Sequence, residues 1–263
     1  MTGAIALDAW DLAAAAALVT VSGAISVALR LGLLRRLVVA SARTVAQLIL
    51  IGYLLSWIFG LDEAPAVMGL MGVMGVVAGH AAVGRSERRF RGALPRAVAT
   101  LLVTGLVTVF TVTTVIIGVD PWYEPQYVIP LFGMILGNAL TGISLCLDTL
   151  LESLDARGAE VELALSLGAT RWEAARPAIA HAVRRGMIPT INAMTVVGLV
   201  SLPGMMTGQI LQGAAPIDAV RYQVVVMFML AAATALGAMA MALLVYRRMF
   251  TAGHQLRADR IRR

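Results

Sequence analysis

Seven long apolar runs, separated by shorter polar segments, follow one another along the sequence. A helix that crosses the hydrocarbon core of a bilayer needs about 20 apolar residues. The sequence therefore predicts an all-α polytopic membrane protein in which residues 1–263 form a single transmembrane domain. We expect its seven transmembrane helices near residues 10–29, 45–60, 64–83, 97–118, 127–147, 187–212 and 222–246.

The arginines between these runs predict the orientation of the chain. They gather in alternate connections and in the basic tail at 247–263, so that 20 of the 21 arginines fall on one side and only Arg221 falls on the other. Positively charged residues are retained in the cytoplasm during membrane insertion. We therefore expect the N-terminus outside, the C-terminus inside, and a multi-pass location in the inner or plasma membrane.

The composition supports the membrane assignment and excludes several kinds of chemistry. Hydrophobic residues make up 59% of the chain and charged residues 14%, against about 25% in soluble domains. The sequence has no lysine, which a Walker A nucleotide site requires. Cys146 is the only cysteine, and the three histidines are far apart, which leaves no close-spaced metal or catalytic pair. We expect a non-catalytic chain with no cofactor of its own. The net charge of +6 follows from membrane topology, so no nucleic-acid partner is expected.

One connection, residues 148–186, is much longer than the others and carries charges of both signs. Long ordered connections are usually functional. The centre of this connection predicts a short helix, a turn at Gly168-Ala169, and a second helix that begins at Thr170. Thr170 and Glu173 have the spacing of a capping box, in which each side chain binds the other residue's backbone N–H. The connection is therefore predicted to form a helix-turn-helix elbow in the cytoplasm.

Glu162, Ala164 and Gly168-Ala169 resemble the EAA---G element of ATP-binding cassette (ABC) permeases. In those permeases a short coupling helix fits a cleft on the ATPase subunit. The resemblance implies that the elbow contacts such a subunit through Glu162, Ala164, Leu165, Gly168, Ala169, Thr170, Arg171 and Trp172.

A longer segment, residues 189–194 and 197–211, closely resembles the FetB-type permeases, and residues 137–145 extend the match. That family comprises bacterial permeases linked to iron export and plant permeases linked to aluminium tolerance. The resemblance implies an ABC-type permease domain whose ATP is hydrolysed by a separate ATPase subunit, as the missing lysine also requires. Because ABC transporters have two membrane halves, a homodimer of this chain is implied.

The sixth apolar run contains Pro203-Gly204 in its interior. Proline removes a backbone donor and clashes with the carbonyl four residues earlier, so we expect the helix to kink or unwind there. Broken helices in transporters line cavities, because lipid cannot satisfy their free carbonyls. The alternative is a kink that only serves packing. The candidate pathway residues are Asn192, Thr195, Ser201, Pro203, Gly204, Met205, Met206 and Gln209, with Asn138 and Thr141 on the fifth run.

The substrate follows from the resemblance alone. The thioethers of Met205 and Met206 are candidate contacts for a soft metal but not firm ligands, and no carboxylate cluster lies inside an apolar run. We therefore expect an exporter of iron, another metal or a metal-linked solute. The alternatives are an importer permease that works with a solute-binding protein and a membrane scaffold without transport activity. The external connections are short and offer a binding protein little surface.

Overall fold

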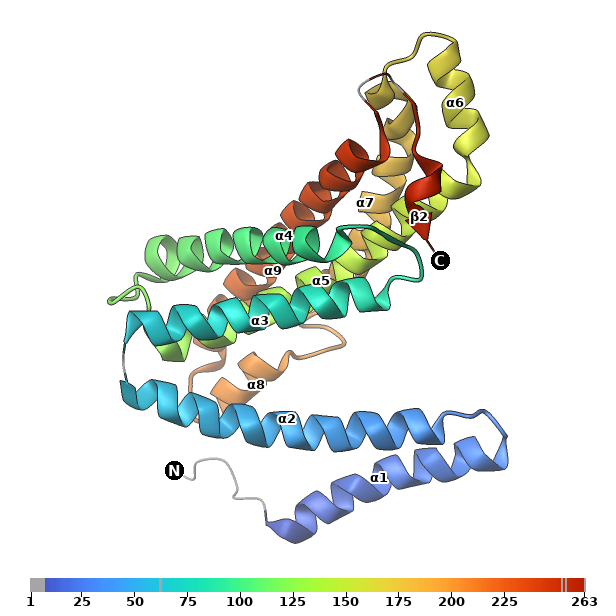
Figure 1. Ribbon diagram of the computed structural model, residues 1–263. Coiled ribbons are helices and arrows are strands. Elements are labelled where there is room, and N and C mark those ends of the chain that lie inside the picture. The colour runs from blue at the N-terminus through green and yellow to red at the C-terminus, as the bar shows by residue number, and fades with distance from the viewer. Residues whose placement is uncertain (1–7, 62, 252, 254, 263) are drawn as a thin grey trace.

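The computed structural model describes residues 8–61, 63–251, 253 and 255–262; residues 1–7, 62, 252, 254 and 263 of the predicted domain lie outside the described residues. The fold is helical (Figure 1). Its α-helices are α1 (Ala9–Ala28), α2 (Leu34–Leu61), α3 (Ala64–Arg85), α4 (Ala93–Phe110), α5 (Pro125–Ala156), α6 (Gly158–Ser166), α7 (Arg171–Val196), α8 (Gly204–Leu211) and α9 (Pro216–Met249). A π-helical segment, η1 (Thr111–Ile117), continues α4, and the tail forms a 3-10 turn, η2 (Ala258–Arg260). Two short strands, β1 (Arg89–Phe90) and β2 (Ile261–Arg262), pair in antiparallel fashion.

Six helices in the described part of the chain are long and apolar enough to cross a membrane: α1, α2, α3, α4 with η1, α5 and α9. The predicted all-α multi-pass class is confirmed at this level. The expected run at 187–212 differs, because it is divided between the end of α7 and the short α8. Two boundaries also differ: α2 starts at Leu34, ahead of the expected 45, and α5 continues to Ala156, well beyond 147.

The core lies where α3, α4, α5, α7 and α9 pack together, with α5 at its centre. The buried side of α5 carries fully enclosed apolar residues along most of its length, including Phe132, Ile135, Ile143, Leu147 and Leu150. The α1–α2 hairpin lies along one side of this core (Figure 1) and leaves most of its large apolar side chains exposed, although Ile58 of α2 is buried. Such outward apolar faces are expected for helices that face lipid or another protein.

Helices α5 and α7 come closest at Gly142 and Gly186. A Cβ atom added to Gly186 would lie 2.6 Å from the carbonyl oxygen of Gly142, and one added to Gly142 would lie 3.0 Å from the carbonyl oxygen of Gly186. Both positions therefore require glycine, since any side chain would force the two backbones apart. This crossing joins the centre of α5 to the centre of α7.

The tail, the α3–α4 connection and α6 meet at one end of the molecule. Strand β1 of the connection pairs with β2 of the tail, and the backbone N–H of Leu256 donates to Oε1 of Glu162 on α6 at 2.8 Å. We call this the elbow end. Helix α9 ends there and begins at the opposite end, close to the start of α5 and to α8 (Figure 1).

Candidate functional site

The elbow has the local structure that the sequence predicts. Helix α6 ends at Ser166, Gly168 turns the chain with a φ of 93°, and α7 begins after its N-cap residue, Thr170. The backbone N–H of Thr170 donates to Oε2 of Glu173 at 2.8 Å, and the N–H of Glu173 donates to Oγ1 of Thr170 at 3.3 Å. The N–H and the hydroxyl of Thr170 both donate to Oε2 of Glu173, and these two bonds lower the pKa of the exposed Glu173 carboxyl. The capping box is confirmed.

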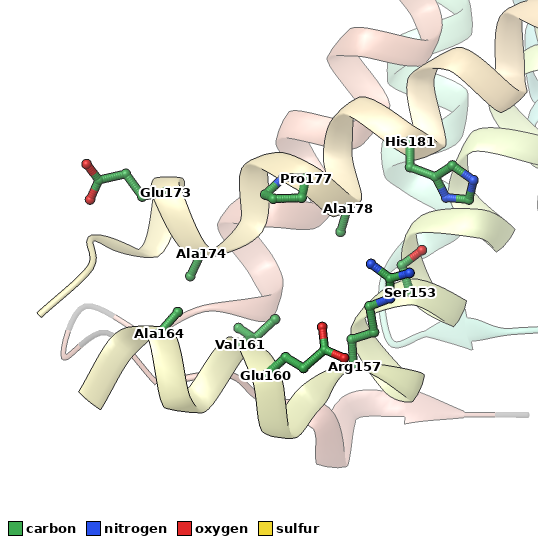
Figure 2. Close-up of a pocket in the computed structure, with 10 residues that line it drawn as sticks. All are labelled: Ser153, Arg157, Glu160, Val161, Ala164, Glu173, Ala174, Pro177, Ala178 and His181. Carbon is green, nitrogen blue, oxygen red and sulfur yellow. The ribbon is translucent and has the colours of Figure 1, made fainter. Parts of the chain in front are cut away.

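A cavity of about 400 Å³ lies inside the elbow, between the end of α5, α6 and the first half of α7 (Figure 2). Four charged or polar residues line it: Arg157 between α5 and α6, Glu160 on α6, and Glu173 and His181 on α7. Ala164 also lines this cavity, so one of the predicted ATPase-contacting residues faces inward.

Most of the other predicted coupling residues are engaged within the chain. Glu162 binds the tail through Leu256, Nη1 of Arg171 donates to the Thr251 carbonyl at 3.4 Å, and Leu165 packs against the core. The Trp172 ring meets Tyr246 edge-on, with ring centres 5.5 Å apart.

The outward face of α6 is carried by two leucines that sequence reasoning did not select. Leu163 is 60% exposed and Leu167 is 80% exposed. Leu163 lies in α6 and Leu167 is its C-cap residue four positions later, so both lie on the same side of the helix end. The pattern of apolar residues could have identified them. Val161, Ala164 and Leu165 lie on the side of α6 that faces the rest of the chain, so Leu163 and Leu167 lie on the exposed side.

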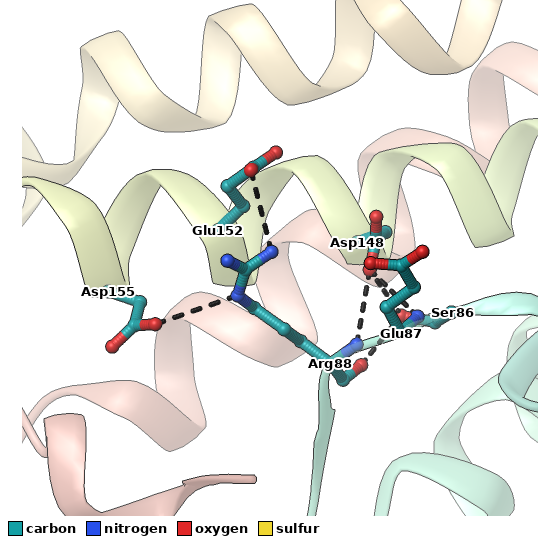
Figure 3. Close-up of polar contacts among 6 residues, drawn as sticks. All are labelled: Ser86, Glu87, Arg88, Asp148, Glu152 and Asp155. Carbon is teal, nitrogen blue, oxygen red and sulfur yellow. Dashed lines mark hydrogen bonds and ion pairs between the residues drawn. The ribbon is translucent and has the colours of Figure 1, made fainter. Parts of the chain in front are cut away.

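A polar joint holds the α3–α4 connection against the end of α5 (Figure 3). Oδ1 of Asp148 accepts hydrogen bonds from the Ser86 hydroxyl at 3.1 Å and from the backbone N–H groups of Glu87 and Arg88 at 3.0 and 3.2 Å. The Arg88 guanidinium reaches further along α5 and pairs with Glu152 and Asp155, each at 3.5 Å. We call this set the Asp148 joint.

At the opposite end, the predicted break in the sixth run is confirmed. Helix α7 ends at Val196, and Gly198 has a φ of 85°. The Gly198 N–H donates to the Ser201 carbonyl at 2.9 Å and forms a tight turn. Pro203 then serves as the N-cap of α8, which begins at Gly204. The unwound residues 197–203 separate α7 from α8.

Two cavities flank α8 and divide the pathway candidates between them. Met205 and Gln209 line a cavity of about 420 Å³, the outer cavity, with Gln126, Tyr127 and Met134 of α5 and Tyr222 of α9. Met206 lines a separate cavity of about 310 Å³, with Met194, Met227 and Gln223. The two methionines, treated as a pair from sequence, therefore face different spaces, because neighbouring helical residues point about 100° apart.

Two amide oxygens at these cavities are buried without a hydrogen-bond partner in the described residues. They are Oε1 of Gln209 at the outer cavity and Oε1 of Gln223 at the second cavity. A buried acceptor without a partner costs about 1–3 kcal/mol. Both oxygens are thus available to a donor or a cation. Gln223 had no assigned role in the sequence analysis, although an amide directly before the apolar run that starts at Val224 is a detectable signal.

Most of the remaining polar pathway candidates are exposed. Asn192, Thr195 and Ser201 are exposed, as is Asn138, whose amide donates to the Met134 carbonyl at 3.0 Å. Thr141 is half-buried and accepts a hydrogen bond from Nη1 of Arg85 at 3.2 Å. The structure therefore places Met205 and Gln209 at one cavity and leaves the other polar candidates on α5, on α7 and in the unwound segment.

The donor set favours weak coordination over a tight metal centre. Within the described residues no group of three or more His, Cys, Asp or Glu side chains is placed to hold a metal ion. The outer cavity instead offers amide and phenol oxygens and two thioethers. Neutral oxygen and thioether groups bind divalent ions more weakly than carboxylate or imidazole clusters.

Comparison with known proteins assigns the chain to a family. The family model described as "Uncharacterised protein family (UPF0014)" matches residues 9–250. The chain is 38% identical over 226 residues to the UPF0014 membrane protein slr1647 of Synechocystis sp., covering 86% of this chain and 87% of that protein. It is 33% identical over 246 residues to the probable iron export permease protein FetB of Escherichia coli, covering 94% and 93%. It is 32% identical over 244 residues to the protein ALUMINUM SENSITIVE 3 of Arabidopsis thaliana, covering 93% and 88%. No solved structure is significantly similar. The resemblance to FetB-type permeases and the multi-pass membrane location are confirmed.

Proposed function

The chain belongs to the UPF0014 family of membrane proteins, and we propose that it is the membrane-spanning subunit of an ABC transporter that exports iron, another metal ion or a metal-linked solute. The main support for the proposal is the unbroken length of α7. This helix runs without interruption for 26 residues from the capping box of the elbow to the break before α8. At 1.5 Å per residue it spans about 39 Å, which is enough to connect an ATPase at one face of the membrane with a cavity near the other.

The proposed topology has seven crossings. Helix α9 starts beside the outer cavity and ends at the elbow end, so α7 and α8 together must carry the chain from the elbow end to the cavity end. We count this interrupted pair as the seventh crossing. The arginine distribution then favours the elbow end as the cytoplasmic one, with the N-terminus outside and the C-terminus inside.

The ATPase partner would dock on α6. Leu163 and Leu167 form an exposed apolar face at the tip of the cytoplasmic end, where lipid does not cover them. An apolar face rimmed by polar residues is typical of a protein interface. In this arrangement the partner binds and hydrolyses ATP, and this chain performs no catalysis.

A second copy of the chain would complete the pathway. Asn138 on α5 and Asn192 and Thr195 on α7 are exposed polar residues, and Leu199 in the unwound segment is 91% exposed. Polar groups on transmembrane helices usually face a bundle interior or a water-filled cavity, because hydrocarbon cannot satisfy them. A homodimer would place these surfaces toward a shared passage.

The outer cavity suits a metal that passes through and is not retained. Its amide and phenol oxygens can replace part of the hydration shell of a cation, and its lack of carboxylates keeps affinity low enough for release. Iron is proposed because a relative that aligns over 94% of this chain is named a probable iron export permease.

The proposal is tested by isolating the chain with its partner from its native membranes. We expect an ABC ATPase to copurify with the wild type and to be lost in Leu163→Asp and Leu167→Asp. Gln255→Asp, which adds the same charge to an exposed residue of the tail, is the matched control and is expected to retain the ATPase. Equal recovery of the ATPase with all variants would remove α6 as the docking helix. ATP-driven uptake of iron into inside-out vesicles would support export, and ATP-driven release from them would favour import.

A further inference from the structure

A small basic cavity lies beside the elbow end, apart from the elbow and the cavities at α8. It has a volume of about 320 Å³ and is lined by Arg91, Arg248, Asp259 and Arg260. These residues come from three separate segments: Arg91 precedes α4, Arg248 lies in the last turn of α9, and Arg260 ends η2 in the tail. Three guanidinium groups against one carboxylate give the cavity wall a net charge of +2.

The backbone of the tail holds these arginines together. The N–H of Arg257 donates to the Met249 carbonyl at 2.7 Å, which returns the tail to the end of α9. Strand β2 then pairs with β1, with Ile261 opposite Phe90, which brings the tail against the segment that carries Arg91. The convergence of the three side chains therefore follows from main-chain contacts, and it persists against their mutual repulsion.

Two donors in this cavity lack partners. Nε of Arg248 and Nη1 of Arg260 are buried, and within the described residues neither has a hydrogen-bond partner. Desolvation, together with the positive charges of Arg257 and Arg248, lowers the pKa of Arg260, while Asp259 raises it in part. Since arginine stays charged in proteins, the three guanidinium groups and one carboxylate that line the cavity leave it with net positive charge.

We propose that Arg91, Arg248 and Arg260 bind a phosphate-bearing anion, whose source is either the headgroup of an anionic phospholipid or free phosphate. Guanidinium groups bind phosphate oxygens through paired, charge-assisted hydrogen bonds, which would satisfy the two buried donors. The cavity lies at the ends of two membrane-crossing helices, α4 and α9, which is the level of lipid headgroups. The carboxylate of Asp259 repels an anion, so it reduces the affinity that the three arginines provide.

Occupation of this site would fasten the tail to the membrane domain. The bound anion would bridge the tail at Arg260, α9 at Arg248 and the α3–α4 connection at Arg91. The same tail binds α6 through Leu256 and Glu162. The state of the anion site would therefore affect how firmly the elbow is held.

The test measures lipid binding to the purified full-length chain in detergent. Native mass spectrometry and thermal unfolding are recorded with phosphatidylglycerol, with phosphatidylcholine and with inorganic phosphate. We expect phosphatidylglycerol to bind and to raise the unfolding temperature more than phosphatidylcholine does. Loss of one guanidinium in Arg248→Gln or Arg260→Gln should weaken binding about 10-fold.

The matched control is Arg247→Gln, which removes the same charge one residue away, from an exposed side chain outside the cavity. It should change binding less than about 2-fold. A shift produced by inorganic phosphate alone would assign the site to free phosphate. If either α9 or tail variant fails to fold, Arg91→Gln, at an exposed loop position, supplies the same test. Equal binding by Arg248→Gln, Arg91→Gln and Arg247→Gln, or equal binding of both lipids together with no effect of inorganic phosphate, would overturn the proposal.

Discussion

The two ends of the molecule are built differently. At the elbow end, the capping box fixes the start of α7, and the Asp148 joint and the bond between Leu256 and Glu162 connect segments that are far apart in sequence. At the cavity end, α7 stops, seven residues are unwound, and α8 is only eight residues long. Gln209 and Gln223 there have buried oxygens without partners in the described residues.

This difference fits two separate roles for the two ends under the proposed function. An end that receives force from a partner must be stiff, whereas an end that opens and closes around a solute must have more than one accessible arrangement. Helix α7 joins the two ends. Its crossing with α5 at Gly142 and Gly186 is the fixed point between them, meaning the contact at which the two helices stay packed together. Four substitutions or conditions test this contrast, beginning with the crossing.

Gly142→Leu should have the largest effect. Its side chain would meet the Thr234 methyl of α9 first and the Gly186 backbone next, and that backbone cannot withdraw without separating α5 from α7. We expect a loss of about 3 kcal/mol of stability from overpacking, seen as early aggregation on heating in detergent, followed by size-exclusion chromatography. Gly137→Leu on the same helix is the control, because a Cβ there meets no atom within 4 Å. Similar heat sensitivity in the two variants would show that the crossing is not the fixed point.

Asp148→Ala should weaken the packing of the α3–α4 connection against α5 at the elbow end. The substitution leaves the backbone N–H groups of Glu87 and Arg88 without their acceptor, whereas the Ser86 hydroxyl keeps the Arg88 carbonyl at 2.6 Å. We expect a loss of about 2 kcal/mol and faster proteolysis of the α3–α4 connection.

Glu152→Ala serves as the comparison for the Asp148 joint. Glu152 pairs with Arg88 from a side chain that is 57% exposed. Its removal should cost no more than about 0.5 kcal/mol. If Glu152→Ala were as damaging as Asp148→Ala, the ion pairs would be holding the connection, and the backbone hydrogen bonds would not.

Gly168→Val should affect the elbow turn with little effect on the rest of the molecule. A β-branched residue is disfavoured at a φ of 93° and costs roughly 1–2 kcal/mol there. We expect normal membrane insertion but reduced coupling between ATP hydrolysis and transport in reconstituted vesicles. Gly168→Asn, which tolerates positive φ better, should retain most of the coupling. Full coupling in Gly168→Val would argue against force transfer through this turn.

Acidification should have the smallest effect, and it should act through Glu173. Because hydrogen bonds from Thr170 lower the folded-state pKa of this carboxyl, the ionised form stabilises the start of α7 at neutral pH. That contribution is complete above the ordinary carboxyl pKa and is lost as the pH falls through the lowered folded value. Glu173→Gln should therefore unfold at a lower temperature than the wild type at pH 7, and the difference should shrink as the pH falls below 4. A difference that stays constant with pH would assign the effect to packing.

Local sequence signals predicted the features that depend on neighbouring residues. The capping box at Thr170, the turn at Gly168 and the break before Gly204 each follow from a few adjacent side chains with strong backbone preferences. Hydropathy predicted the long helices for the same reason. It counted the interrupted run at 187–212 as one span, because a hydropathy average does not detect where the backbone unwinds.

The features that sequence analysis missed depend on contacts between distant segments. Gly142 meets Gly186, Asp148 meets Arg88, and the tail pairs with β1 only after the helices have packed. The same holds for the separation of Met205 from Met206, since the walls of their cavities come from α5, α7 and α9. Residue spacing within one helix shows which face a side chain occupies, but it does not show what lies opposite.

The most direct test of the proposed export function is the iron content of cells that lack this chain. The strains compared are the deletion, the deletion restored with wild type, and the deletion restored with Met205→Ala or with Met206→Ala. Because Met205 lines the outer cavity and Met206 lines the separate one, we expect high iron in the deletion, normal iron with wild type and with Met206→Ala, and incomplete recovery with Met205→Ala. Equal iron in every strain would contradict iron export, and a defect confined to Met206→Ala would move the pathway to the other cavity.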